Sequence, residues 1–186
     1  MKIAPEVRAE AAKGVPVIIK GLMDPRAIAV ARQVADWPSY SSLWQPGRQQ
    51  TGYEKLDLRH LIANAGIGDR WAPTHEGLHL LEVVGLKCRE ALDVRDEKWD
   101  LYLLRYRDYS YIPPHRDEAG LFGLRHVRVN ALVRQCASGG MLRLGDRPVR
   151  LDVGDGLFFY PDEVEHSVDT VVGERLVLTC GAWVPA

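Results

Sequence analysis

The chain has 186 residues, of which 46% are hydrophobic and 26% charged, so it can bury a core and is not a wholly disordered chain. Its formal net charge of −1 provides no global field for gripping nucleic acid or an anionic membrane. Three scattered cysteines (Cys88, Cys136 and Cys180) are too few for a disulfide framework or a thiolate zinc site, and they fit a reducing compartment. The sequence shows neither a secretory signal pattern nor an apolar run of roughly 20 residues, and therefore predicts a cytoplasmic protein without nucleic-acid or membrane partners.

The first half of the chain predicts helices and one short strand. Residues 1–14 have the pattern of a short polar helix or a frayed end, and the β-branched run at 15–20 predicts a strand. Asp24-Pro25 resembles a helix N-cap followed by proline at the first helical position, which predicts a helix over 26–37. A second helix is predicted over 74–94. The apolar faces of the two helices consist of Ile28, Ala31, Val34 and Ala35, and of Leu78, Leu81, Val84 and Leu92.

Residues 38–55 have the composition of a loop, because they are rich in Ser, Pro, Gly and Gln. The segment also carries aromatic side chains and a cation. It is therefore either a lid over a site or a plain connection, and Trp44, Arg48 and Tyr53 are its candidate substrate contacts.

From Trp99 onward, short β-branched or alternating runs recur at a spacing of roughly 8–12 residues, separated by turn residues. This texture favours a mainly β fold, either a sandwich, a jelly roll or a barrel. No linker separates it from the first half, so we expect one domain over 1–186, with helical support and the candidate lid in 1–98 and a β-core in 99–184. The eight predicted strands are 101–107, 111–117, 126–134, 140–144, 148–153, 156–160, 166–172 and 174–184.

The most informative local motif is His115-Arg116-Asp117. Residues two apart on a strand point to the same face, so this imidazole and this carboxylate can converge. The strand count places them on the second β-strand and His166 on the seventh, and these two strands can be neighbours in a jelly roll. Two imidazoles and one carboxylate with open positions suit a non-haem Fe(II) centre that activates oxygen, whereas a structural hydrogen-bonded pair is the alternative.

Arg175 follows His166 by nine residues and begins the last predicted strand. A guanidinium held inside a β-barrel must meet an anion, because an unpaired buried charge is very costly. A carboxylate cosubstrate that chelates iron would supply this partner through a bidentate pair.

The set of His115, Asp117, His166 and Arg175 resembles the Fe(II)/2-oxoglutarate-dependent dioxygenase superfamily, and within it the prolyl 4-hydroxylase-like branch. The resemblance covers roughly residues 99–184. It extends to Leu104-Arg-Tyr106, the Ser138-Gly139-Gly140 turn, the run from Val153 to Pro161, and Gly173-Glu-Arg175.

This resemblance implies a double-stranded β-helix, a cupin-like jelly roll, with N-terminal helices packed on one sheet. It implies His115, Asp117 and His166 as both the metal ligands and the catalytic residues. The implied cofactors are Fe(II), 2-oxoglutarate as cosubstrate and O2, with ascorbate as an optional reductant, and the implied reaction releases succinate and CO2.

The resemblance also assigns a cosubstrate pocket. Arg175 would bind the C5 carboxylate of 2-oxoglutarate, and Tyr106 matches a position where related enzymes place a tyrosine against the cosubstrate. Asn130 is a further candidate for this pocket. Val177 stands where several branches carry serine, so Thr179 on the same strand face is the candidate replacement hydroxyl.

Three positions depart from other branches. Asp117 is the carboxylate that halogenating members lack, which disfavours halogenation. Ala119 and Gly181 stand where the nucleic-acid dealkylase branch has asparagine and arginine, which disfavours nucleic-acid repair.

The expected function is therefore hydroxylation of a small molecule, such as an amino acid or a biosynthetic intermediate. A peptidyl (prolyl-type) hydroxylase is the alternative within the class, and desaturation in place of hydroxylation stays open. A non-catalytic metal-binding module of the cupin type is the alternative from another class, although it would have no use for Arg175 with Tyr106.

The remaining polar and aromatic candidates lie outside this pattern. An arginine-rich stretch (Arg116, Arg125, Arg128 and Arg134) would suit an anionic group of the substrate. Trp183 shares strand parity with Arg175 and either lines the pocket or packs in the core. The histidines interpreted as ordinary polar residues are His60, His75, His79 and His126.

Overall fold

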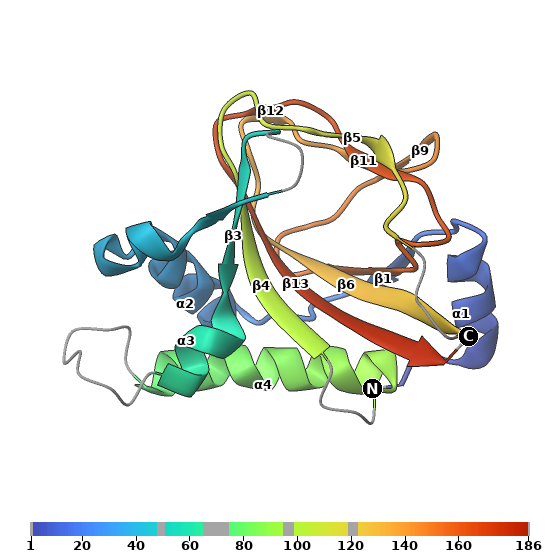
Figure 1. The fold of residues 1–186 in the computed structure, drawn as a ribbon, viewed down its shortest axis with the longest axis horizontal. Helices are drawn as coiled ribbons and strands as arrows, with labels where there is room; N and C mark the ends of the chain where they lie inside the picture. The colour runs from blue at the N-terminus through green and yellow to red at the C-terminus, as the bar shows by residue number, and fades with distance from the viewer. Residues whose placement is uncertain (1, 48–50, 65–74, 95–98, 119–122, 186) are drawn as a thin grey trace.

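Two antiparallel β-sheets face each other in a computed structural model, which describes residues 2–47, 51–64, 75–94, 99–118 and 123–185 (Figure 1). Helices cover the side of the larger sheet that faces away from the smaller one. The helical elements are α1 (Pro5–Ala12), α2 (Pro25–Asp36), the 3-10 helix η1 (Pro38–Leu43), α3 (Leu58–Asn64) and α4 (His75–Leu92).

The larger sheet has seven strands in the order β1-β10-β6-β13-β4-β3-β2. Three of them come from the first half of the chain, so residues 1–98 contribute part of the β-structure as well as helical support. The bounds are β1 (Val17–Ile19), β2 (Gln45–Pro46), β3 (Tyr53–Asp57), β4 (Trp99–Tyr106), β6 (Leu124–Arg134), β10 (Gly156–Phe159) and β13 (Arg175–Pro185).

The smaller sheet has four strands in the order β5-β11-β8-β9, and β12 pairs with β7 beside it. The predicted strand 111–117 is shorter than expected, because β5 ends at His115. The bounds are β5 (Ile112–His115), β7 (Ser138–Gly139), β8 (Leu142–Leu144), β9 (Arg147–Val149), β11 (His166–Val168) and β12 (Val171–Val172). The two facing sheets form the predicted double-stranded β-helix.

Local sequence explains the predicted helices. Asp24 accepts a hydrogen bond from the backbone N–H of Ala27 at 2.8 Å, which caps α2 as the sequence predicts. In α4, the four residues of the predicted apolar face are all buried. A third helix, α3, was not predicted; it begins directly after β3, where Asp57 accepts a hydrogen bond from the backbone N–H of His60 at 3.0 Å.

The interpretation of residues 38–55 as a loop is wrong for most of the described part. The segment contains η1 and β2, and β3 begins at Tyr53. Trp44 is not a lid residue: it is buried in the core on the helical side, and the guanidinium carbon of Arg105 lies 4.0 Å from its ring centroid. Arg48 lies outside the described residues.

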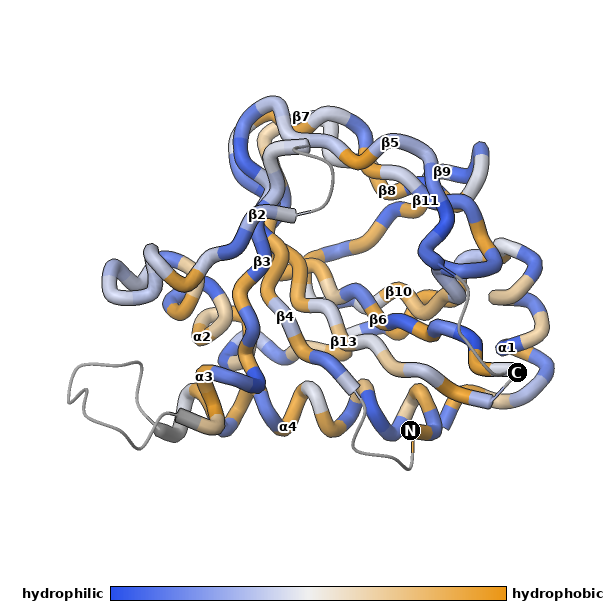
Figure 2. Tube along the Cα trace, in the orientation of Figure 1, coloured by the Kyte–Doolittle hydropathy of each residue, from blue (hydrophilic) through white to orange (hydrophobic). Residues whose placement is uncertain are grey.

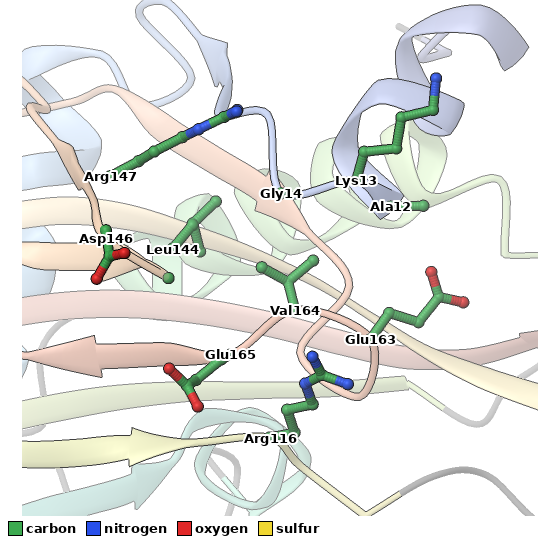
Figure 3. A pocket seen from close by; sticks show the side chains of 11 residues that line it. Ala12, Lys13, Gly14, Arg116, Leu144, Asp146, Arg147, Glu163, Val164 and Glu165 are labelled. Carbon is green, nitrogen blue, oxygen red and sulfur yellow. The ribbon is translucent and has the colours of Figure 1, made fainter.

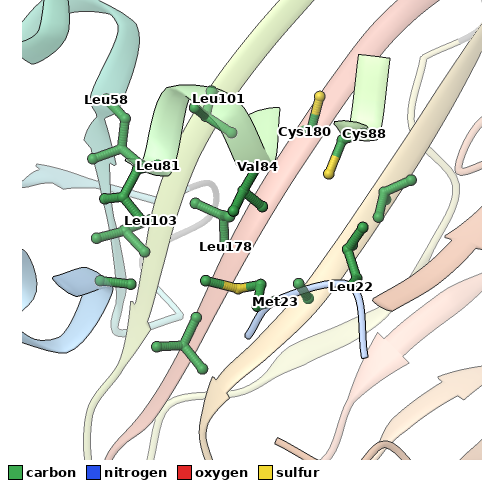
Figure 4. Close-up of a cluster of buried hydrophobic side chains, with 14 of the residues drawn as sticks. Leu22, Met23, Leu58, Leu81, Val84, Cys88, Leu101, Leu103, Leu178 and Cys180 are labelled. Carbon is green, nitrogen blue, oxygen red and sulfur yellow. The ribbon is translucent and has the colours of Figure 1, made fainter. Parts of the chain in front are cut away.

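The core is divided by the larger sheet. Alternate residues of β13 face the helices, and Leu178 and Cys180 pack there with Leu81 and Cys88 of α4 (Figure 4). The residues between them face the smaller sheet, where Val177 packs in a second cluster. Hydrophobic residues accordingly run along β4, β13 and α4 in Figure 2. Within the described residues, the helices are all too short or too polar to cross a membrane.

Because Leu81 lies on the buried face of α4, we expect Leu81→Ala to destabilise the protein strongly. The Leu81 side chain is fully buried, so its truncation should lower the free energy of unfolding by about 2–5 kcal/mol, measured by urea unfolding. Leu86→Ala is the matched control on the same helix, because Leu86 is 45% exposed, and it should stay within about 0.5 kcal/mol of wild type. Equal losses would contradict the face assigned to α4.

Candidate active site

The structure brings His115, Asp117 and His166 together. β5 and β11 pair antiparallel, and His115 lies directly opposite His166 in that register. Their ring centroids are 4.2 Å apart. Asp117 lies just past the end of β5, where its backbone N–H donates to the carbonyl of Pro161 at 2.8 Å. One ligand atom from each of the three residues lies within 4.8 Å of the others.

Backbone carbonyls fix the protonation of both imidazoles. Nδ1 of His115 lies 2.9 Å from the carbonyl oxygen of Pro113, and Nδ1 of His166 lies 3.1 Å from that of Val164. A carbonyl oxygen only accepts hydrogen bonds, so each Nδ1 carries the proton. The lone pair of each neutral ring is therefore on Nε2, the arrangement that a metal-binding histidine needs.

The electrostatics of the site also favour a cation. Burial alone would raise the pKa of Asp117, but the neighbouring imidazoles of His115 and His126 and the charge of Arg128 lower it well below its usual range. Burial, followed by repulsion from His115, lowers the pKa of His166 to about 4. At neutral pH the site thus offers an ionised carboxylate and an uncharged His166, so a divalent metal need not displace a proton from either. Two imidazoles and one carboxylate suit a non-haem Fe(II) ion.

Arg175 provides a second, separate binding group. It is the first residue of β13, it is 5% exposed, and it lies opposite Tyr106 of β4. Its guanidinium carbon is 5.3 Å from the ring centroid of Tyr106. The ring of Tyr53 in turn stacks on the ring of Tyr106, with centroids 5.4 Å apart. Among the described residues, no carboxylate pairs with this guanidinium. Burial lowers the pKa of Arg175 and raises that of Tyr106 to about 12, so at neutral pH both remain protonated.

Asn130 and Thr179 form a pair of their own. They lie opposite each other on β6 and β13, and the Thr179 hydroxyl donates to the Asn130 side-chain oxygen. Thr179 shares a face with Arg175 but is four residues further along the strand, about 13 Å away. Val177, between them, is buried in the core that faces the smaller sheet. The cosubstrate roles of Asn130 and Thr179 remain predictions.

His126 is a site residue that the sequence interpretation missed, and Arg128, predicted only as one of four arginines that would suit an anionic group of the substrate, also contacts Asp117. Nδ1 of His126 lies 3.2 Å from Asp117 Oδ2, and Arg128 Nη2 lies 3.1 Å from the same oxygen. Trp183 stacks on His126 with ring centroids 4.7 Å apart, so Trp183 lines the site. Strand parity with Asn130 was the available signal, because residues 126, 128 and 130 share one face of a strand.

Two of the other three arginines of the arginine-rich stretch form ion pairs away from the site. Arg125 pairs with Glu163, and Arg134 pairs with Glu174 and Asp36. Arg116, between two of the candidate ligands, lines a pocket of about 480 Å³ (Figure 3) and also the pocket of about 210 Å³ that His115 lines.

The remaining histidines described here are outside the site. The Nδ1 atom of His79 lies 3.1 Å from a carboxylate oxygen of Glu82 on the exposed surface of α4, and His60 is exposed on α3. The side chain of His75 lies outside the described part of the chain, as does Ala119.

Two smaller pockets are each lined by a residue of the candidate site. One of about 210 Å³ is lined by His115, Tyr53 and Thr51, and another of about 250 Å³ is lined by Arg175 and Gln135. His115 and Arg175 are therefore both accessible to small molecules.

Several solved structures share this fold. A Pseudomonas putida prolyl-4-hydroxylase aligns with a TM-score of 0.64 and 19% identity, over 97% of this chain and 98% of that chain. A Trichoplax adhaerens prolyl hydroxylase, solved with a peptide fragment of hypoxia inducible factor, gives 0.64 and 13% over 96% and 89%. HygX from Streptomyces hygroscopicus, solved with nickel and 2-oxoglutarate bound, gives 0.56 and 13% over 99% and 88%. Neither a protein-family model nor a curated protein sequence matches the chain.

These likenesses confirm the predicted fold. The chain has the jelly-roll architecture of these structures, and the resemblance to the prolyl 4-hydroxylase-like branch holds at the level of the fold. These structures include prolyl hydroxylases and HygX, which was solved with 2-oxoglutarate bound, and they leave the kind of substrate open.

The burial of His166 predicts acid sensitivity in the metal-free protein. A histidine in the unfolded chain takes up a proton near pH 6.5, whereas native His166 resists protonation down to about pH 4, so native stability falls as pH drops from 6.5 toward 4. When the pH is lowered from about 7.5 to about 5, the free energy of unfolding of the chelator-treated protein should fall by about 2 kcal/mol more in wild type than in His166→Gln, measured by urea unfolding. Identical pH slopes for the two proteins would contradict the neutral, buried state of this ring.

Proposed function

We propose that this protein is an Fe(II)- and 2-oxoglutarate-dependent oxygenase that hydroxylates a small molecule, such as an amino acid or a biosynthetic intermediate. Succinate and CO2 would be released with each turnover. The observation that carries the proposal is the pairing of a convergent His-Asp-His group with a buried guanidinium that has no carboxylate partner among the described residues.

The buried guanidinium supports a dicarboxylate cosubstrate. A cation that is 5% exposed and unpaired destabilises the protein, and an anionic ligand removes that penalty on binding. Arg175 would hold the distal carboxylate of 2-oxoglutarate, with the Tyr106 ring beside it. A metal-binding module without turnover has no need of this residue, so the observation favours the oxygenase.

The metal-binding residues would act by position and charge. His115, Asp117 and His166 would hold Fe(II), which with the cosubstrate supplies the chemistry of oxygen activation. The carbonyls of Pro113 and Val164 orient the two imidazoles, and His126 and Arg128 hold the second oxygen of Asp117. The protein thus contributes a preorganised set of ligands.

A peptidyl hydroxylase is the second candidate, because two of the solved structures with this fold are those of prolyl hydroxylases. Mass spectrometry of proline-containing peptides incubated with the iron-loaded protein, 2-oxoglutarate and O2 would reveal a gain of one oxygen atom. Such a product would replace the small-molecule assignment and leave the cofactor assignment intact.

Arg175→Met should separate cosubstrate binding from stability. Anaerobic titration of the Fe(II)-loaded protein with 2-oxoglutarate should produce a weak metal-to-ligand charge-transfer band in wild type, and the variant should bind about 100-fold more weakly. The variant's free energy of unfolding without cosubstrate should stay unchanged or rise, because it lacks an unpaired buried charge. Arg143→Met, which removes a surface partner of Asp169, is the control and should bind normally. Absence of the band in iron-loaded wild type would overturn the proposal.

Asp117→Ala should abolish turnover. Loss of the only carboxylate in the His-Asp-His group should remove O2-dependent succinate release and weaken Fe(II) binding, while far-UV circular dichroism shows an intact fold. Succinate release at the wild-type rate would show that another group of residues carries the chemistry.

A further inference from the structure

One row across the larger sheet carries opposite charges on either side of a glycine. Gly181 of β13 lies opposite Asp100 of β4 on one side and opposite Arg128 of β6 on the other. Neighbouring strands are about 4.8 Å apart, so the α-carbons of the acid and the base are about 10 Å apart. They form no ion pair with each other. This row faces the smaller sheet, because Gly181 has the strand parity of Arg175 and Thr179.

Gly181 allows the acid to approach His126. A Cβ atom at Gly181 would lie 2.7 Å from Asp100 Oδ1 and 3.1 Å from His126 Nε2, so both atoms lean over the space that a side chain would fill. Any other residue would push them apart. Asp100 is half-buried, and within the described part of the chain its carboxylate has neither an ion pair nor a hydrogen bond.

His126 connects this row to the metal-binding group. Its side chain is 8% exposed, and its Nδ1 faces Asp117 Oδ2 at 3.2 Å. Nδ1 makes no hydrogen bond within the described residues, but the charge of the Asp117 carboxylate 3.2 Å away favours a proton on Nδ1, which leaves the Nε2 lone pair on the side of Asp100. The charged Asp100 carboxylate and the neutral Nε2 of His126 are thus two neighbouring acceptors, and no donor among the described residues lies between them. An ammonium group could donate a hydrogen bond to each.

The surroundings supply an aromatic wall and an anion-binding group. Trp183 stacks on His126 and is 38% exposed, so its ring is available to a cation. Arg128 places one terminal nitrogen on Asp117, and a guanidinium carries five N–H donors. Its Nε is buried and has no partner among the described residues.

We propose that the substrate is a zwitterion of the free amino acid type, whose ammonium group binds Asp100 and His126 and whose carboxylate binds Arg128. This inference rests on the proposed oxygenase function and names its substrate class. Because both His126 and Arg128 contact Asp117, a molecule in this position lies beside the metal-binding group. The matched opposite charges favour a zwitterion over a peptide, whose internal residues carry neither free group.

The test uses saturation-transfer NMR with the Zn(II)-loaded protein saturated with 2-oxoglutarate, a state that cannot turn over. The probes are pools of the twenty free L-amino acids, followed by the N-acetyl and carboxamide derivatives of any amino acid that binds. At least one free amino acid should bind, and each derivative should bind about tenfold more weakly, because each lacks one charge.

Asp100→Asn identifies the ammonium site. The variant should bind the free amino acid about tenfold more weakly than wild type does and should leave the affinity for the N-acetyl derivative unchanged. Gly181→Ala should also weaken binding of the free amino acid, because its Cβ displaces Asp100 and His126. Asp57→Asn is the matched control: Asp57 is a carboxylate on the adjacent strand β3, and its variant should bind within about twofold of wild type.

Binding of 2-oxoglutarate to the same samples separates the two possible failures. The zwitterion proposal is overturned and the oxygenase proposal stands if 2-oxoglutarate binds but no free amino acid does. The same holds if Asp100→Asn weakens binding of the N-acetyl derivative as much as binding of the free amino acid. If 2-oxoglutarate itself does not bind, both proposals fall. Binding of a capped proline-containing peptide in place of amino acids would also overturn the zwitterion proposal.

Discussion

The antiparallel pairing of β5 with β11 is the constraint on which the candidate active site depends. It sets His115 opposite His166, two residues that are far apart in the chain, and a slip of one residue would turn one imidazole to the other face of the sheet. The carbonyls that fix the proton on Nδ1 come two residues before each histidine, from Pro113 on β5 and from Val164 just before β11. Register therefore decides both the position and the protonation of the two rings.

The larger sheet serves stability with one face and chemistry with the other. Along β13, Leu176 and Leu178 pack toward the helices, whereas Arg175 and Thr179 face the smaller sheet. The hydrophobic face can bury enough apolar area to hold polar and charged groups on the opposite face, where they contribute less to stability. The period of two in a β-strand makes this division possible within one element.

The charged groups on the face of the larger sheet that is turned toward the smaller sheet differ in whether the protein itself supplies a partner. Asp117 is surrounded by His115, His126 and Arg128, which hold it ionised. Arg175 lacks a carboxylate partner among the described residues, so an anion bound beside its buried guanidinium would stabilise the protein. Groups of this kind lower stability in the free protein and become favourable interactions when a ligand of opposite charge binds.

The sequence by itself predicted the β-rich second half and the convergence of His115 with Asp117, because these depend on the alternation of residues along single strands. The expected strand count and the family resemblance added His166 and Arg175. It also located α2 and α4 through their apolar faces. It did not reveal α3, nor β3, whose first residues lie in the segment of loop composition and whose place in the sheet is set by pairing with β4. Only the tertiary structure placed His126 and Arg128 against Asp117, and Asp100 beside Gly181, because those contacts join different strands and depend on sheet register, which no local pattern encodes.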